Sequence, residues 1–217
     1  MTLPMPGANF SLPEPSPPPK TERPAWQVAG GIILGFTALL YVIEVFDQLT
    51  RNSLDGEGIR PRTLGGLWGI LWAPMLHYGW GHLLANTIPV IVLGFLVLVT
   101  GITRGLTATA IIWVVGGLGT WLTGWNNSVH LGASVLVFGW LAFLLTLGLF
   151  TRKLTQILLG LVILLVYGSL LWGILPGAKG VSWQGHLFGL LGGVAAAWLM
   201  SSEERGARAA KRAKAQQ

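Results

Sequence analysis

The chain contains no cysteine and few charged residues. The absence of Cys among its 217 residues excludes a disulfide framework, a thiol nucleophile and a thiolate metal site. Charged residues make up only 10% of the chain, against about 25% in an ordinary soluble domain. Because 52% of the residues are hydrophobic, the sequence does not supply the polar surface that a soluble fold of this size needs. The composition therefore indicates an integral membrane protein.

The sequence contains several long runs of apolar residues. A helix needs roughly 20 apolar residues to cross a hydrocarbon core of about 30 Å, and such runs recur along the chain. The 11 Trp and 31 Gly fit the same environment, because Trp favours membrane interfaces and Gly permits close helix contacts. We predict an all-α, polytopic bundle of six transmembrane helices at residues 26–46, 82–100, 105–124, 131–150, 154–174 and 183–200.

Two polar regions flank this predicted membrane domain of residues 26–200. Residues 1–25 are rich in Pro and in polar side chains, so we expect a disordered cytoplasmic leader without a cleavable signal peptide. Residues 201–217 form a basic tail. Because the tail directly follows an apolar span, anchoring to anionic lipid of the bilayer is favoured over nucleic-acid binding. Its basic residues are Arg205, Arg208, Lys211, Arg212 and Lys214.

Residues 47–81 differ from the predicted spans. The segment contains Pro61 and Pro74 and mixes charged residues with Trp and Tyr. Its apolar part, residues 63–76, is too short to cross the bilayer directly. We therefore predict a long, structured first loop that lies in the membrane interface, with a re-entrant part as an open alternative.

The distribution of Lys and Arg predicts the orientation. With six spans, both termini share one side with the turns near residues 104 and 152, and this side carries ten Lys and Arg residues. The opposite side, which includes the long loop, carries four. Because basic loops stay in the cytoplasm, we expect both termini there and the long loop on the extracytoplasmic side. The absence of an Arg-rich amphipathic leader favours a bacterial cell membrane over a mitochondrial one.

Polar side chains cluster near the extracytoplasmic ends of three predicted spans. His82 and Asn86 open the second span, Ser134 opens the fourth and His186 opens the sixth. At a rise of about 1.5 Å per residue, each lies within roughly 10 Å of the outer surface. Ionisable groups at membrane depth usually face a cavity or a partner. The coincidence of depth and side therefore indicates one common site.

The residue types at this site fit nucleophilic catalysis. Ser becomes nucleophilic when a base takes its proton, and His is the usual base near neutral pH, which favours a pair of Ser134 with His186. His82, Asn86 and the amide of Ser134 are candidate donors to an oxyanion. Structural interpretations stay open, because a Ser in an apolar span commonly bonds to its own helix and an intramembrane His commonly serves in packing.

Neighbouring residues bear on the proposed pair. Glycines recur every four residues from Gly185 to Gly193, which permits close contact between the fourth and sixth helices, although such stripes occur at helix contacts of any function. His130 is a rival base because it lies four residues before Ser134. Its expected place in a loop ranks it below His186.

Three short motifs, in order and on matching spans, make the chain resemble the rhomboid intramembrane proteases. The resemblance extends from about Trp26 to Met200. A single G-x-S motif is weak evidence, but the three motifs together are quite specific. The motifs are His77-x4-His82-x3-Asn86, Gly132-Ala133-Ser134 and Gly185-His186-x2-Gly189.

The resemblance implies a six-helix fold and the activity of a serine-type intramembrane endopeptidase without metal or cofactor. Ser134 would be the nucleophile and His186 the general base, in a dyad without a carboxylate. His82 and Asn86 would line the oxyanion hole, and His77 would structure the first loop. The implied substrates are membrane proteins whose transmembrane helices unwind readily near the outer face, usually beside a small residue.

Two positions depart from the family pattern. The family commonly has Gly after the catalytic Ser, where this chain has Val135, a β-branched residue that we expect to crowd the site or stiffen the helix start. The family's Tyr one turn after the Ser, which packs against the catalytic His, is Phe138 here. The adjacent Trp-Arg pair that some members have in the first loop is absent. Neither reacting group is lost.

Other functions stay open beside the protease. A small-solute transporter would place polar groups through the full membrane depth, whereas the inner halves of the second, fourth and sixth spans are almost entirely Leu, Val, Ile, Ala and Gly. A catalytically weak or inactive rhomboid-like protein that binds transmembrane helices is favoured by Val135. Zinc and aspartyl intramembrane proteases fit poorly, because the chain has no H-E-x-x-H motif and neither Asp47 nor Asp55 lies within a span. The sequence does not indicate the oligomeric state.

Overall fold

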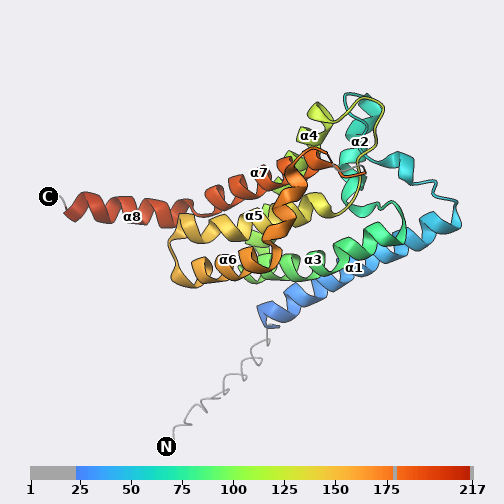
Figure 1. Cartoon of the computed structure of the whole chain (residues 1–217). Helices are drawn as coiled ribbons and strands as arrows, with labels where there is room; N and C mark the ends of the chain where they lie inside the picture. The colour runs from blue at the N-terminus through green and yellow to red at the C-terminus, as the bar shows by residue number, and fades with distance from the viewer. Residues whose placement is uncertain (1–22, 178–179, 216–217) are drawn as a thin grey trace, which may run out of the picture.

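Helices make up nearly all of the structure, a computed structural model that describes residues 23–177 and 180–215 (Figure 1). In this part of the chain there is no strand, and one isolated β-bridge pairs Ile59 with His130. The predicted leader, residues 1–25, lies mostly outside the described residues. The α-helices are α1 (Ala25–Leu49), α2 (Leu64–Trp72), α3 (Gly79–Val99), α4 (Ile102–Thr123), α5 (Ser134–Thr151), α6 (Leu154–Tyr167), α7 (Trp183–Met200) and α8 (Ser202–Ala215); the 3₁₀ helices are η1 (Asp55–Glu57), η2 (Ala73–Met75) and η3 (Gly168–Ile174).

Five of these helical segments are long and apolar enough to cross a membrane, namely α1, α3, α4, α5 and α6 together with η3. A sixth span results if α7 is taken together with α8, which continues it after a bend of 49°. The predicted all-α, polytopic membrane fold is therefore confirmed. The fourth span, predicted at residues 131–150, begins at Ser134 instead, because main-chain bonds to other segments hold the residues before it outside the helix.

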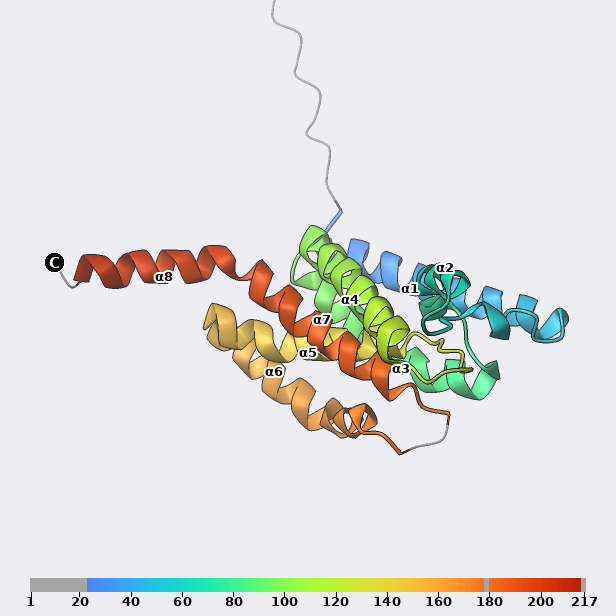
Figure 2. The same ribbon diagram turned by 90° about the horizontal axis from the view of Figure 1, so that it is seen from above.

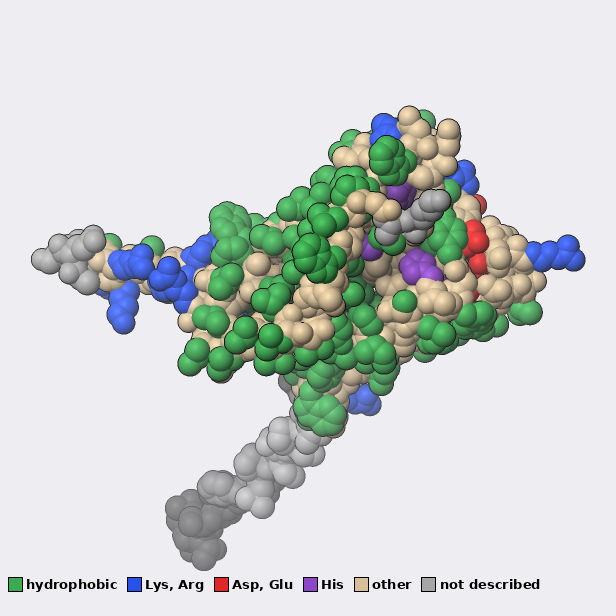
Figure 3. Space-filling view, in the orientation of Figure 1, with side chains coloured by type: hydrophobic (Ala, Val, Ile, Leu, Met, Phe, Trp, Pro, Cys, Tyr) green, Lys and Arg blue, Asp and Glu red, His purple; other side chains and the backbone are tan. Residues whose placement is uncertain are grey.

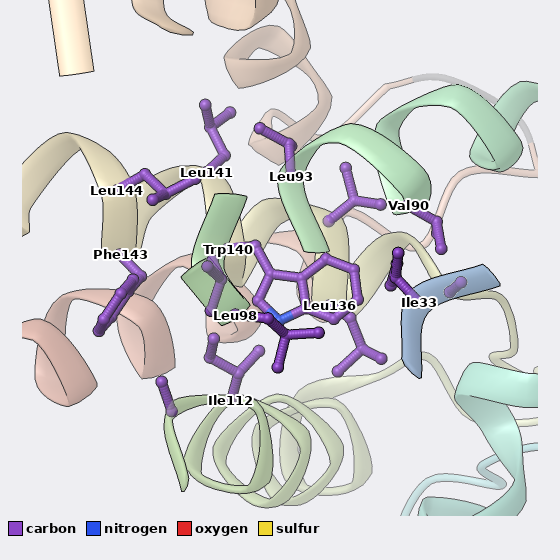
Figure 4. Packing of buried hydrophobic residues seen from close by; sticks show 14 of the residues in the cluster. Ile33, Val90, Leu93, Leu98, Ile112, Leu136, Trp140, Leu141, Phe143 and Leu144 are labelled. Carbon is purple, nitrogen blue, oxygen red and sulfur yellow. The ribbon is translucent and has the colours of Figure 1, made fainter. Parts of the chain in front are cut away.

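Helix α5 is the central helix of the bundle. It packs against α3, α4, α6 and α7, and it has the largest buried share of the long apolar segments. Figure 4 shows Leu136, Trp140 and Phe143 of α5 among side chains from α1, α3 and α4. The indole N–H of Trp140 donates to Oγ1 of Thr109 at 2.9 Å. This bond gives a polar group at membrane depth the partner that lipid does not offer.

Glycines allow α7 to lie directly against α5 and α4. A Cβ on Gly193 would overlap the carbonyl oxygen of Gly139, and a Cβ on Gly189 would overlap that of Val135. On the α4 side, a Cβ on Gly192 would lie 3.0 Å from Cα of Ile112. The glycines of α7 are thus the surface through which it contacts both neighbours, and close packing without side chains is what holds helices together in lipid.

The long first loop is ordered around α2, which packs against α4. The indole N–H of Trp113 donates to the carbonyl oxygen of Ile70 at 2.7 Å, and the guanidinium of Arg62 donates to that of Leu122 at 2.8 Å. Figures 1 and 2 place α2 and α8 at opposite ends of the bundle. We call the end with residues 47–81 and 124–133 the loop end and the end where α8 begins the tail end.

The basic tail is helical from Ser202. Arg208 donates to two carbonyl oxygens at the C-terminal end of α5. They belong to Thr151, at 2.6 Å, and Phe150, at 2.5 Å. Lys153, just before α6, forms an ion pair with Glu204 at 3.0 Å. A cation at a helix C-terminus satisfies carbonyls that have no partner within the helix. These bonds tie α8 to the tail end, and its contact with anionic lipid stays a prediction.

Candidate active site

Ser134 is the first residue of α5 and lies at the loop end. The connection before it is fixed by a bond from the main-chain N–H of Gly132 to the carbonyl oxygen of Ala73 at 2.8 Å. Gly132 has a φ of +121°, and a Cβ there would lie 2.6 Å from Cε1 of His82. Because other residues rarely adopt this φ and no side chain fits, the approach to Ser134 requires glycine at this position.

His186 faces Ser134 from the N-terminal part of α7. Its Nε2 lies 2.9 Å from Oγ of Ser134, which is hydrogen-bonding distance. Its Nδ1 lies 2.9 Å from the carbonyl oxygen of Gly173 in η3. Phe138, one turn after Ser134, stacks on the imidazole with ring centroids 4.0 Å apart and planes inclined by 7°. Residues of α5 and η3 therefore hold the imidazole, and His186 is only 9% exposed.

His82 and Asn86 lie one turn apart on α3, beside the Ser134–His186 pair. Nδ1 of His82 accepts a bond from the main-chain N–H of Tyr78 at 3.3 Å, which leaves the proton on Nε2, the nitrogen that lies toward Gly132. Nδ2 of Asn86 donates to the carbonyl oxygen of His82 at 3.0 Å, so one of its two hydrogens is used within α3. Within the described structure neither side chain donates to the Ser134 hydroxyl.

A cavity of about 380 Å³ brings these four side chains together. Ser134, His186, His82 and Asn86 all line it, and most of the remaining lining is apolar or backbone. Figure 3 shows His side chains gathered around a hollow at the loop end, on a face that is otherwise largely hydrophobic. A mostly apolar cavity with a few convergent polar groups is typical of a binding or active site.

Val135 departs from the family pattern but does not line this cavity. Its Cγ2 occupies the place that a Cβ of Gly116 in α4 would take, and Gly189 of α7 lies against its other side. The two glycines form a recess for the β-branched side chain. Of the two effects expected of Val135, the structure corrects the crowding of the site, because the side chain packs against α4 and α7. Stiffening of the helix start stays a prediction.

His130, the rival base, is engaged elsewhere. Its Nδ1 lies 2.6 Å from Oγ of Ser182 and its Nε2 lies 2.8 Å from Oγ of Ser128. The Ser182 side chain also accepts a bond from the main-chain N–H of Gly185 and so caps α7. Burial lowers the pKa of His130 below its ordinary value. The structure thus brings His186, and not His130, to Ser134.

His77 is buried behind the nucleophile. Its Nε2 accepts a bond from the main-chain N–H of Ala133, the residue before Ser134, at 3.4 Å. The ring lies 5.1 Å from that of His82 in an edge-on arrangement. Burial, with a smaller effect of the nearby His82, lowers the pKa of His77 to about 3. The imidazole is therefore a neutral acceptor that holds the connection before α5, which agrees with a structural role.

Two residues of the site are not indicated by the sequence reasoning. Ser182 carries a usable signal, since a Ser three residues before Gly185, at the start of an apolar run, occupies a typical N-cap position. Gly173 carries none. It is one of 31 glycines, and it reaches the imidazole through a main-chain carbonyl that every residue possesses.

Fold and site together define a polytopic helical membrane protein with a buried Ser–His pair at one end of its spans. Within residues 23–177 and 180–215, no three His, Asp or Glu side chains are placed to hold a metal ion. The model of the rhomboid domain matches residues 64–203, which is more than half of the chain. The chain therefore belongs to the rhomboid family, and the match contains Ser134, His186, His82 and Asn86.

Several bacterial proteins are similar to this chain over two thirds of its length or more. The uncharacterized protein Rv1337 of Mycobacterium tuberculosis is 56% identical over 201 residues, which cover 89% of this chain and 84% of that protein. The uncharacterized protein ML1171 of Mycobacterium leprae is 50% identical over 206 residues, which cover 90% of this chain and 82% of that protein. The protein YdcA of Bacillus subtilis is 30% identical over 147 residues, which cover 67% of this chain and 72% of that protein. Its name assigns it provisionally to the rhomboid proteases. No solved structure gives a significant match.

Proposed function

We propose that this rhomboid-family chain is a serine endopeptidase that cleaves transmembrane helices of other membrane proteins through Ser134 and His186. The observation that carries the proposal is the 2.9 Å separation of Ser134 Oγ and His186 Nε2, at the edge of a cavity that also contains His82 and Asn86. A Ser that serves only its own helix bonds to the carbonyl three or four residues earlier. The hydroxyl of Ser134 meets an imidazole instead.

The reaction begins with proton transfer from Ser134 to His186. Nε2 takes the hydroxyl proton as Oγ attacks the carbonyl carbon of the scissile peptide. His186 then gives the proton to the departing amine, and the acyl group remains bound to Ser134 as an ester. Water attacks this ester with His186 again as the base, and His186 then returns the proton to Oγ of Ser134 as the new carboxyl terminus leaves. Stacking on Phe138 keeps the imidazole in one orientation through both steps.

The oxyanion of the tetrahedral intermediate needs donors on the cavity side of Ser134. The main-chain N–H of Ser134 is available because it belongs to the first turn of α5. Nε2–H of His82 and the second amide hydrogen of Asn86 come from α3. Loss of one such donor typically lowers the rate by about 10²–10³.

We place the loop end on the extracytoplasmic side of a bacterial cell membrane, with both termini in the cytoplasm. The support is the excess of Lys and Arg, ten against four, on the side of the termini. The cavity then lies near the outer face, where a substrate helix that unwinds locally reaches Ser134. The partners are a transmembrane-helix protein and the bilayer, and we assign the basic α8 to anionic lipid rather than to nucleic acid.

Labelling with a fluorophosphonate probe tests the activated serine. The purified full chain is compared in detergent with Ser134→Ala, His186→Ala and the control Ser169→Ala, which removes a different cavity-lining hydroxyl. We expect labelling of the wild type and of Ser169→Ala, and none of the other two. Cleavage of a co-reconstituted single-span substrate is then measured with the same four proteins. A folded wild type that is neither labelled nor active would contradict the proposal and favour a helix-binding protein.

A further inference from the structure

The imidazole of His186 has a second polar partner that belongs to the main chain. Its Nδ1 lies 2.9 Å from the carbonyl oxygen of Gly173. A carbonyl oxygen only accepts, so Nδ1 must carry a proton in this bond. In a neutral imidazole the other nitrogen is then an acceptor. Nε2 therefore presents its lone pair to Oγ of Ser134, which is the state that a general base needs.

The glycine at position 173 is required by its surroundings. A Cβ there would lie 2.8 Å from Cζ of Phe138 and 3.2 Å from Nδ1 of His186. The first distance is shorter than packed side chains tolerate, and the second would push the imidazole away from the carbonyl. Only a residue without a side chain lets the main chain of η3 approach the edge of a ring whose face is already covered by Phe138.

A carbonyl in this position suits the membrane. A carboxylate on Nδ1 would bring a permanent charge into a buried site at membrane depth, where charged side chains are costly. The pair of a neutral imidazole and a carbonyl contains no net charge. It still fixes one tautomer, which is the property that determines whether Nε2 accepts or donates.

We propose that Gly173 is a positioning residue, whose backbone carbonyl sets the tautomer and orientation of His186. The effect on catalysis rests on the endopeptidase function proposed above, but the tautomer itself does not. Gly173 belongs to the segment of α6 and η3, the least buried of the long apolar segments. The orientation of the base therefore depends on where this lightly packed segment lies against α7.

The tautomer is measured directly by ¹⁵N NMR of the full chain with labelled histidine. The chain has four His residues, so the signals of His186 are assigned by their loss in His186→Ala. At pH 8, where an ordinary imidazole is neutral, we expect the proton of His186 on Nδ1. A proton on Nε2, or a rapid average of both tautomers, would overturn the proposal whether or not the protein is a protease.

A pair of matched variants connects the tautomer to the rate. Gly173→Ala places a methyl group against Phe138 and His186, whereas Gly168→Ala, in the same 3₁₀ helix, places one near the flexible side chain of Leu164. We expect Gly173→Ala to lower kcat by about tenfold or more, with little change in KM, since a misplaced general base loses part of its roughly 10²–10⁴-fold contribution. Gly168→Ala should stay within about twofold of the wild type.

The NMR spectrum separates positioning from general damage to the fold. In Gly173→Ala the signals of His186 should move toward a mixture of tautomers, while those of His130, which contacts other segments, stay in place. A Gly173→Ala variant with the wild-type tautomer and the wild-type rate would overturn the proposal. If the wild type shows no protease activity, the proposed function fails, and the tautomer measurement still decides the role of Gly173.

Discussion

Val135 directly follows Ser134 on α5, yet its side chain lies between Gly116 of α4 and Gly189 of α7. Side chains in such a contact are packed as closely as molecules in a crystal, so a recess and the group that fills it must match in volume. The glycine that the family pattern places after the nucleophile is thus replaced here by a residue with its own pocket. We expect this replacement to affect helix packing and not the chemistry of Ser134.

Removal of the Val135 side chain should therefore weaken the fold without activating the site. In Val135→Gly we expect a loss of about 1–3 kcal/mol in unfolding free energy, from the emptied recess and the flexibility of Gly within a helix. The rate of fluorophosphonate labelling should stay within about twofold of the wild type. Unfolding in detergent and labelling kinetics are measured on the same preparation. A large gain in labelling with unchanged stability would contradict the placement of Val135.

The contact between Val135 and Gly116 can also be tested by a substitution at Gly116. A Cβ on Gly116 overlaps Cγ2 of Val135, so Gly116→Ala should destabilise the protein by about 1–3 kcal/mol. In the double variant with Val135→Ala, part of this loss should be regained, with a coupling energy of about 0.5–3 kcal/mol in a double-mutant cycle. Strictly additive effects in the cycle would mean that the two residues are not in contact.

Truncation of His130 should mainly lower the stability of the protein, whereas truncation of His186 should mainly lower the labelling. His130 bonds to Ser128 and Ser182 and supports the start of α7, so His130→Ala should lower stability by about 1 kcal/mol, as the loss of a helix cap does, and leave most of the labelling. His186→Ala removes the base and should lower labelling by about 10²-fold or more. Initial labelling rates are compared at equal amounts of folded protein. Equal losses in both variants would contradict the assignment of the base.

At the scale of elements, the connection before α5 sets where the nucleophile stands. It is bonded to Ala73 through Gly132, to Ile59 through His130 and to His77 through Ala133. The connections to Ala73 and Ile59 are made between main-chain groups, and the connection to His77 uses a side chain that must be neutral to accept. The long first loop thus positions Ser134 from outside the predicted spans, and acid should loosen this contact.

The sign of the pH effect follows from the pKa of His77, which burial lowers from 6.5 to about 3. The unfolded chain binds a proton at this residue more readily than the folded chain. Stability should therefore fall as the pH drops below about 6.5, by up to about 1.4 kcal/mol per pH unit, until the folded protein is protonated as well. The effect is present only below neutrality and is absent at pH 8.

The variant His77→Gln isolates this contribution. Gln keeps an acceptor for the Ala133 amide but does not titrate. Thermal unfolding of wild type and variant is followed between pH 8 and pH 4.5, and the stability of the variant should depend less steeply on pH. Some dependence should remain, because the pKa of His130 is also lowered by burial. Parallel curves for the two proteins would show that His77 is not the group responsible.

At the scale of the whole molecule, the spans could be predicted because lipid forces the backbone of each crossing segment into a helix. The shared depth of Ser134, His186, His82 and Asn86 follows from that topology. The direction of Val135 and the carbonyl of Gly173 do not follow, because both depend on which helices meet and at what distance. The fourth span illustrates the same limit, since apolar residues before Ser134 are kept out of α5 by bonds to the first loop.

The orientation of the molecule is directly testable because the chain has no cysteine. Ser53, in the first loop, and Ser202, at the start of α8, are both exposed and lie at opposite ends of the bundle. Ser53→Cys and Ser202→Cys therefore each introduce a single thiol with almost no change in volume. We expect a membrane-impermeant maleimide to label Ser53→Cys in intact bacterial cells and Ser202→Cys only after lysis.

The two labelling patterns have different consequences for the site. Because Ser134 and His186 lie at the loop end, labelling of Ser53→Cys from outside places the cavity within reach of substrate helices that unwind near the outer face. The reverse pattern would put the termini outside despite their excess of Lys and Arg. It would also move the cavity to the cytoplasmic half of the bilayer, so that substrates would have to unwind there, and α8 would meet the outer surface.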